Sequence, residues 1–195
     1  GELRMSRDDY LNIFRETGAL LEGHFVLTSG RHSPSYFQCA KVLQHPQYLS
    51  MFSQKISDHF ESLDIDTVIS PAVGGIVIGT DVGKVMAKRT IFAERENGDM
   101  TLRRGFNIKP GEKVLVVEDV ITTGGSVKEV MNVVEAFGGI VMGVAVIVDR
   151  SNGLVGLHEN QFSLVPMEVL SYEESEIPEE LAAIPTTKPG SRSLK

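Results

Sequence analysis

The sequence is poor in cysteine, because Cys39 is the only one among 195 residues. A single thiol cannot form a disulfide within the chain, so a fold that depends on internal disulfides is excluded. This cysteine usage is typical of proteins from reducing compartments. The first four residues, Gly1 to Arg4, are polar and lack the apolar core of a signal peptide, and we expect the natural start at Met5. We therefore expect a cytoplasmic protein.

Basic residues and long hydrophobic runs are also scarce. The 19 Lys and Arg residues face 26 Asp and Glu residues, which gives a net charge of -7. Nucleic acid is therefore not expected as the main partner. Asp81, Lys84 and Lys88 interrupt the most hydrophobic stretch, and no run approaches the roughly 20 apolar residues that a membrane span needs. We expect no membrane partner.

The overall composition is that of a globular protein. Apolar residues make up 42% of the chain and charged residues 23%, which is ordinary for a protein with a packed core. A chain of this length buries a sizeable core without disulfides. We therefore expect a single domain over residues 1–195.

Short apolar runs rich in β-branched residues alternate with helical patterns. The runs predict strands at 67–69, 90–92, 114–117 and 141–148, and the helical patterns cover 76–86 and 127–137. The segment 94–111 is polar and contains glycine, so we expect a long loop, with or without a hairpin. These strands are too apolar to leave one face of a sheet exposed to solvent. They therefore predict an α/β fold, with a mostly parallel central sheet and helices on both faces. Ligands of such sheets bind beyond the carboxyl ends of the strands.

The most informative motif begins where the apolar run 114–117 ends. Glu118 and Asp119 follow directly, and a Thr/Gly/Ser loop leads into a helix. Gly124 and Gly125 permit positive φ angles that turn successive N–H groups toward one point, and the helix start adds partial positive charge. The pattern predicts a phosphate cradle. Ionised carboxylates would repel that phosphate, so we expect them to bind another part of the ligand. Because they only accept hydrogen bonds, they suit the hydroxyl groups of a sugar that carries the phosphate. Either acid alone is also compatible with an ordinary solvated strand end.

The whole string resembles the signature of the type I phosphoribosyltransferases, which bind 5-phosphoribosyl 1-diphosphate (PRPP). The resemblance implies that Glu118 and Asp119 act in catalysis by holding the ribose hydroxyls and stabilising developing positive charge. It assigns the PRPP phosphate to the loop residues Val120, Ile121, Thr122, Thr123, Gly124, Gly125 and Ser126. It also implies Mg²⁺ as cofactor, bridging diphosphate and ribose oxygens, with no residue of the chain assigned as a metal ligand.

A second loop, residues 70–75, resembles the pyrophosphate loop of the same family. The resemblance implies that the backbone N–H groups of Val73, Gly74 and Gly75 face the diphosphate. Taken alone, this loop is also compatible with a tight turn whose glycines serve packing.

A long loop concentrates Arg95, Arg103 and Arg104 in an otherwise acidic chain. Loops of this length are usually lids or binding elements, and the arginine fork suits a leaving diphosphate. The family resemblance implies a mobile catalytic loop over 94–105, with Arg95 as its catalytic residue. It also implies a homodimer, because this loop reaches the neighbouring subunit in the family. A solvated hairpin remains the alternative for the other two arginines.

The acceptor base is indicated by two further segments. Residues 25–37 resemble the N-terminal hood segment of the orotate phosphoribosyltransferase family. The resemblance implies that residues of about 20–45 of this chain form a small hood together with its C-terminal segment. The tail 188–192 belongs to the same resemblance. Thr28 and Gly74 stand where some members have lysine. The strand end at Arg150 resembles the family's orotate site, which implies that Arg150 and Thr122 bind orotate.

The expected activity is therefore the transfer of the 5-phosphoribosyl group from PRPP to orotate, giving orotidine 5-monophosphate and pyrophosphate in pyrimidine (UMP) biosynthesis. One alternative is a phosphoribosyltransferase for a purine base, which would have little use for Arg150. The other is a PRPP-sensing regulator without catalysis, although such proteins usually carry a nucleic-acid face that this acidic chain lacks.

Overall fold

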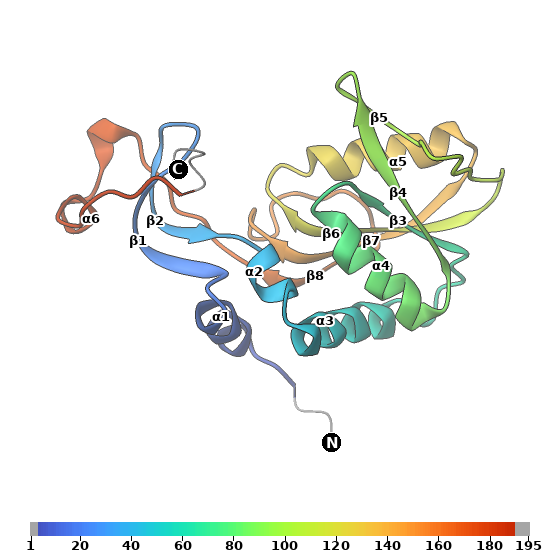
Figure 1. The fold of residues 1–195 in the computed structure, drawn as a ribbon, viewed down its shortest axis with the longest axis horizontal. Coiled ribbons are helices and arrows are strands. Elements are labelled where there is room, and N and C mark those ends of the chain that lie inside the picture. The colour runs from blue at the N-terminus through green and yellow to red at the C-terminus, as the bar shows by residue number, and fades with distance from the viewer. Residues whose placement is uncertain (1–3, 190–195) are drawn as a thin grey trace. The chain divides into compact units, whose positions relative to one another are not determined.

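The computed structural model describes residues 4–189, which divide into two compact units (Figure 1). Unit 1 combines the chain up to residue 42 with the chain from residue 168 onward, and unit 2 comprises residues 43–167. Of the tail 188–192, residues 190–192 lie outside the described residues. Within residues 4–189, no helix is both long and apolar enough to cross a membrane.

Unit 2 contains a six-stranded sheet with the order β5-β4-β3-β6-β7-β8. Every neighbouring pair is parallel except β4 and β5, which form an antiparallel hairpin. The predicted mostly parallel sheet is thus confirmed. The strands are β3 (Thr67–Pro71), β4 (Arg89–Glu96), β5 (Asp99–Thr101), β6 (Lys113–Ile121), β7 (Ile140–Asp149) and β8 (Gln161–Pro166).

Helices cover both faces of this sheet, as predicted, and Figure 1 shows α4 and α5 on opposite sides of the strands. Alternate residues of β6, Val114 and Val116, join a buried cluster with valines of α5 (Gly125–Ala136). On the other face, α4 (Gly75–Met86) lies so close to β3 and β4 that a side chain at Gly79 or Gly83 would collide with them. The helix α3 (Pro46–His59) packs beside α4.

The predicted long loop begins as a hairpin. Residues 94–96 of β4 pair with residues 99–101 of β5, and the turn between them places Asn97 and Gly98 at positive φ. Regular structure then stops until β6 begins at Lys113. Whether the segment 94–105 is a mobile catalytic loop stays a prediction.

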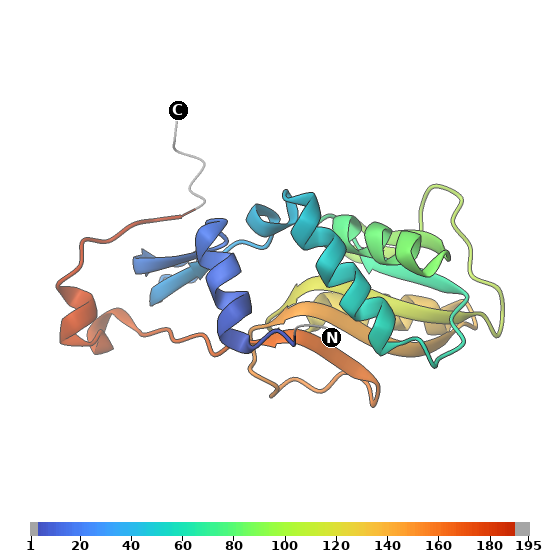
Figure 2. The same cartoon turned by 90° about the horizontal axis from the view of Figure 1, so that it is seen from below.

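Unit 1 is built from both ends of the described chain, as Figure 2 shows. Its centre is an antiparallel pair, β1 (Leu20–Val26) and β2 (His32–Phe37). The C-terminal segment joins this pair through bridges from Phe25 to Thr187 and from His32 to Tyr172. The unit also holds α1 (Arg7–Glu16), η1 (Glu174–Glu176) and α6 (Glu179–Ala182), while α2 (Ala40–Leu43) spans the point where the chain passes into unit 2.

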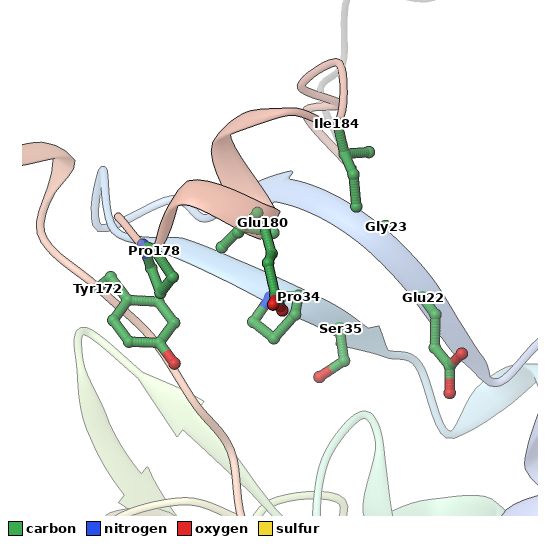
Figure 3. Close-up of a pocket in the computed structure, with 9 residues that line it drawn as sticks. Glu22, Gly23, Pro34, Ser35, Tyr172, Pro178, Glu180 and Ile184 are labelled. Carbon is green, nitrogen blue, oxygen red and sulfur yellow. The ribbon is translucent and has the colours of Figure 1, made fainter. Parts of the chain in front are cut away.

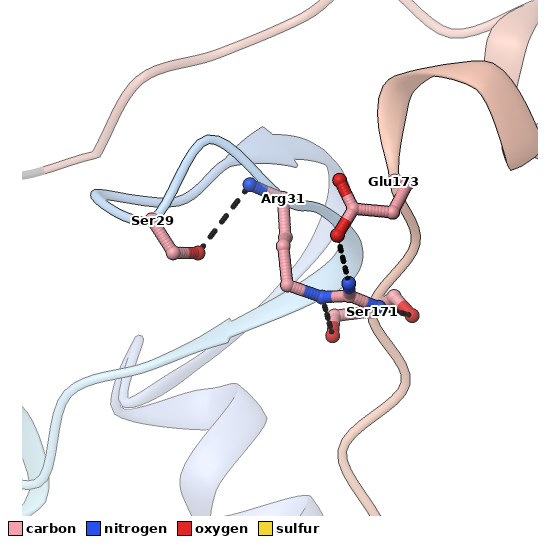
Figure 4. A network of polar contacts seen from close by, with 4 residues as sticks. All are labelled: Ser29, Arg31, Ser171 and Glu173. Atoms are coloured by element: carbon pink, nitrogen blue, oxygen red, sulfur yellow. Dashed lines mark hydrogen bonds and ion pairs between the residues drawn. The ribbon is translucent and has the colours of Figure 1, made fainter.

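Side chains reinforce this union of distant segments. Arg31, in the turn after β1, donates to the Ser171 hydroxyl at 2.8 Å and to its carbonyl at 2.9 Å, and it pairs with Glu173 at 2.6 Å (Figure 4). The ring nitrogens His24 Nε2 and His32 Nδ1 lie 2.6 Å apart in the buried part of the unit. The structure thus brings residues 20–37 together with the C-terminal segment. The role of this unit as a hood stays a prediction.

Candidate active site

The two acids sit where β6 leaves the core. The strand is fully buried from Val114 to Val117, and Glu118, which follows, is also buried, with only 7% of its surface exposed. The backbone N–H of Asp119 donates to Glu118 Oε1 at 3.0 Å, and the N–H of Val120 donates to Asp119 Oδ1 at 2.8 Å. These local bonds fix both carboxyl groups at the carboxyl end of the strand, where parallel sheets bind ligands.

Burial changes the charge of this pair. Loss of solvent around Glu118, together with the hydrogen bond and negative charge of Asp119, raises the pKa of Glu118 to about 9. Glu118 therefore holds a proton at neutral pH in the free protein. The sequence led us to expect an ionised acceptor instead, because it does not show how deeply the strand end is buried. A neutral carboxyl group still binds a hydroxyl, since it both donates and accepts.

The β3–α4 turn lies directly against the acids. A Cβ atom added at Gly75 would stand 2.8 Å from Glu118 Oε1, and one added at Gly74 would stand 3.2 Å from Asp119 Oδ2. Only glycine allows the backbone to approach this closely. The peptide bond between Ala72 and Val73 is cis, and the Val73 side chain is 81% exposed. The structure therefore brings the second predicted loop together with the acid pair. Its glycines meet a packing requirement, whichever ligand the turn binds.

The predicted phosphate cradle surrounds a cavity of about 190 Å³. Gly124 adopts a φ of +79° and α5 begins at the next residue, so the chain reverses tightly and starts the helix at the cavity. A helix N-terminus with outward N–H groups is a ready anion site. The cavity is lined by Glu118, Val120, Ile121, Thr122, Thr123, Gly124, Gly125, Ser126 and Val127. Asp119 does not line it and lies on the side of the Gly74 turn instead.

Arg150 lies next to the cradle. It follows β7, the neighbour of β6 in the sheet, and its backbone N–H donates to the Ile121 carbonyl at 2.9 Å. The preceding Asp149 is buried, and its carboxylate accepts from the Ser151 N–H, the Ser151 hydroxyl and the Gly153 N–H at 2.6–3.0 Å. The carboxylate of Asp149 thus shapes its own loop. The structure therefore places Arg150 beside the predicted phosphate site.

The three loop arginines are each paired with a glutamate. Arg95 makes a two-pronged contact with Glu129 of α5, at 2.5 and 2.9 Å, which raises the pKa of Arg95. Arg104 binds Glu94 at 2.7 Å, and Arg103 lies 3.8 Å from Glu96. None of the three arginines lines the cradle cavity. The sequence did not reveal these partners, and a catalytic role for Arg95 stays a prediction.

The acid pair is compatible with a metal ion brought by a substrate. Within residues 4–189, no group of three or more His, Cys, Asp or Glu side chains is placed to hold a metal. Mg²⁺ rarely needs such a cage, because one or two carboxylates, water and substrate phosphates suffice. The carboxyl groups of Glu118 and Asp119 both lie against the Gly74–Gly75 turn, and Glu118 also lines the cradle cavity, so their oxygens lie beside the predicted phosphate sites.

Two further features of the structure were not predicted from the sequence. Val155 and Leu157, in the loop that follows Arg150, lie against Gly124 of the cradle. The only sequence signal of this loop is the turn-forming string Asp149 to Gly153. Unit 1 contains a larger cavity, of about 470 Å³ (Figure 3), lined by Glu22, Gly23, Pro34, Ser35, Tyr172, Pro178, Glu180, Leu181 and Ile184. Its lining is mainly apolar with two acids, which is unlike a phosphate site.

The chain is similar to known phosphoribosyltransferases. Residues 40–164 match the model of the phosphoribosyl transferase domain. The chain is 57% identical to an orotate phosphoribosyltransferase of Chlorobium phaeobacteroides over 97% of this chain and 98% of that protein. It is 60% identical to an orotate phosphoribosyltransferase of Chlorobaculum parvum, with the same coverage. The crystal structure of orotate phosphoribosyltransferase from Aeropyrum pernix has 25% identity and a TM-score of 0.64, over 80% of this chain and 92% of that one. With more than half of its residues identical to such relatives over nearly its full length, the chain belongs to the orotate phosphoribosyltransferase family.

Proposed function

We propose that this protein transfers the 5-phosphoribosyl group of PRPP to N1 of orotate, giving orotidine 5-monophosphate and pyrophosphate. The observation that carries the proposal is the meeting of three parts at one edge of the sheet: the acid pair of β6, the β3–α4 glycine turn and the cradle at the start of α5. Together they offer partners for the diol, the diphosphate and the 5-phosphate of one substrate.

In this proposal, the two glycine-containing loops divide the phosphates of PRPP between them. The loop Val120–Ser126 wraps the 5-phosphate with backbone N–H groups and with the hydroxyls of Thr122, Thr123 and Ser126. The turn Val73–Gly75 presents its backbone to the diphosphate. Both loops lead into helix N-termini, whose partial positive charge favours bound anions.

Glu118 and Asp119 are the proposed catalytic acids. They bind the two ribose hydroxyls and hold the ring while the bond from the anomeric carbon to the diphosphate breaks and N1 of orotate bonds to that carbon. The negative charge of the pair stabilises the positive charge that develops on the ring. No covalent nucleophile is required.

Arg95 is the proposed stabiliser of the departing diphosphate. In the free protein it binds Glu129, so the diphosphate has to replace that carboxylate as its partner. Such an exchange is feasible because exposed ion pairs contribute only about 0–1 kcal/mol. Bound Mg²⁺ supplies further charge neutralisation of the diphosphate, and Glu118 and Asp119 would hold it through ribose oxygens or water.

Arg150 and Thr122 are the proposed orotate-binding residues. The planar guanidinium of Arg150 matches the orotate carboxylate with two parallel hydrogen bonds, which discriminates against uracil because uracil lacks that carboxylate. We also propose a cytoplasmic homodimer in which the segment 94–105 serves the neighbouring subunit.

The test is an absorbance assay of orotate consumption with PRPP and Mg²⁺. We expect turnover with orotate and none with adenine or hypoxanthine. Arg150→Ala is expected to lower kcat/KM for orotate by about 30- to 3,000-fold, the range for losing a buried charged partner. The matched control is Arg15→Ala, which removes an exposed ion pair with Glu22 in unit 1 and should leave turnover unchanged. Turnover of a purine base, or PRPP binding without release of pyrophosphate for any base, would refute the proposal.

A further inference from the structure

The loop that connects β7 to β8 is held at its start by hydrogen bonds to the side chains of Asp149 and Ser151. The Asp149 carboxylate accepts three hydrogen bonds from Ser151 and Gly153, as described above. The Ser151 hydroxyl, in turn, accepts from the N–H of Val155 at 3.0 Å. The first half of the loop is therefore tied to the end of β7 by side-chain bonds rather than by a regular helix or strand.

Gln161, the first residue of β8, holds the second half of the loop. Its Oε1 atom accepts from the N–H of Leu157 at 2.6 Å, and its Nε2 atom donates to the carbonyl of Val155 at 2.9 Å. One amide side chain thus satisfies a donor and an acceptor of the loop backbone, two residues apart. This arrangement fixes the positions of Val155 and Leu157.

The side chains of Val155 and Leu157 lie directly behind the phosphate cradle. A Cβ atom added at Gly124 would stand 2.8 Å from Leu157 Cδ2 and 3.1 Å from Val155 Cγ1. Both side chains also pack against the buried cluster that includes the valines of α5. The two side chains therefore form a wall against which the Gly124 turn is set.

We propose that Gln161 is a positioning residue for the phosphate cradle, acting through Val155 and Leu157 on the backbone at Gly124. The inference rests on the proposed function, in which this cradle binds the 5-phosphate of PRPP. Backbone N–H groups bind a phosphate tightly only when they already point at one spot, because each degree of freedom frozen on binding costs affinity. A wall held by Gln161 supplies that preorganisation.

The test compares phosphate affinity with stability. Gln161→Met keeps nearly the length of the side chain but removes both hydrogen bonds to the loop. We expect it to weaken ribose 5-phosphate binding by about tenfold in titration calorimetry, the effect of about 1.4 kcal/mol. KM for PRPP should rise to a similar extent, with kcat changed less than about twofold, because Gln161 touches no reacting atom.

A matched control separates this effect from general destabilisation. Gln54 on α3 is exposed and makes one side-chain hydrogen bond, to Asp58, away from the loop. Gln54→Met should bind ribose 5-phosphate like the wild type. A thermal midpoint of Gln161→Met within a few degrees of the wild type would show that the affinity loss is not unfolding.

Each outcome decides the question. Wild-type affinity in Gln161→Met, or an equal loss in Gln54→Met, would overturn the inference while the proposed function stands. If Gln161→Met does not fold, Leu157→Ala tests the same wall, and unchanged affinity in that variant would overturn the inference. A wild-type protein that does not bind ribose 5-phosphate would refute the cradle itself, and with it the role of Gln161.

Discussion

Substitution of Gly124 by alanine tests the geometry of the cradle most directly. Two independent features of the structure oppose a side chain at this position. The backbone has a φ of +79°, which L-residues adopt at a cost, and an added Cβ would lie 2.8 Å from Leu157 Cδ2 and 3.1 Å from Val155 Cγ1. Carbon atoms in normal contact are about 3.5–4.0 Å apart, so something has to move.

The two contributions add to a measurable loss of stability. The left-handed backbone costs about 1–2 kcal/mol for a residue with a Cβ atom. Overpacking a filled site costs about 1–3 kcal/mol, depending on how far its neighbours yield. We therefore expect Gly124→Ala to lower the free energy of unfolding by about 2–5 kcal/mol. It should also weaken ribose 5-phosphate binding, because the turn cannot stay in place.

Urea unfolding, with the adjacent glycine as control, measures this effect. Gly125 has no positive φ, and the nearest atom to an added Cβ there is the Thr123 hydroxyl at 3.6 Å. Gly125→Ala should therefore change the free energy of unfolding by less than about 0.5 kcal/mol. Leu157→Ala in the Gly124→Ala background removes the contacts with Leu157 and leaves the one with Val155, so the cost of the alanine should fall toward its backbone part, about 1–2 kcal/mol. Equal stability of the two alanine variants would refute the reasoning.

Three further outcomes are expected. The pKa of Glu118 in the folded protein is about 9, well above its ordinary 4.5, so the stability that this group contributes is complete below pH 4.5 and is lost as the pH rises toward 9. In urea unfolding, the free energy of unfolding of Glu118→Gln should therefore rise relative to that of the wild type by up to about 1.4 kcal/mol per pH unit over this range. Parallel curves of stability against pH for the two proteins would contradict this. Asp119→Asn should lower kcat by about one to three orders of magnitude, so near-normal turnover would argue against its assignment. His32→Ala should cost about 1–3 kcal/mol in thermal unfolding, because His24 loses a buried partner, and an unchanged midpoint would count against that pair.

The sheet could be predicted because its signal is local. Strands buried on both faces give runs such as Val114 to Val117, and each run becomes a strand of the parallel sheet. The prediction was incomplete at residues 94–111, where a hairpin precedes the irregular chain. Charged and polar strand residues such as Arg95 and Asp99 give no apolar period, so the sequence left open whether a hairpin forms.

The chemistry of the site was predictable only in part. The acid pair and each of the two glycine loops are short continuous strings in the sequence, so each can be recognised locally. The parallel sheet then brings the strand ends that carry them to one edge. Contacts between distant segments leave no such signal: the glutamate partner of Arg95 is 34 residues away, and Gly75 meets Glu118 only after β3 and β6 pair. The protonation of Glu118 depends on burial that arises from the same pairing. In the sequence, Gln161 is an ordinary polar residue before an apolar run, so its contacts with the loop could not be predicted.

The charge state of Glu118 also bears on how an acidic chain admits a polyanionic substrate. The net charge of -7 counts every carboxyl group as ionised, but a proton on Glu118 removes one negative charge at the edge of the cavity itself. Exposed charges farther than about 8 Å from the cradle are largely screened at physiological salt. Within that distance, the helix N-terminus and loop N–H groups attract phosphate. Local attraction therefore outweighs distant repulsion at the cradle, and an acidic surface does not conflict with PRPP binding.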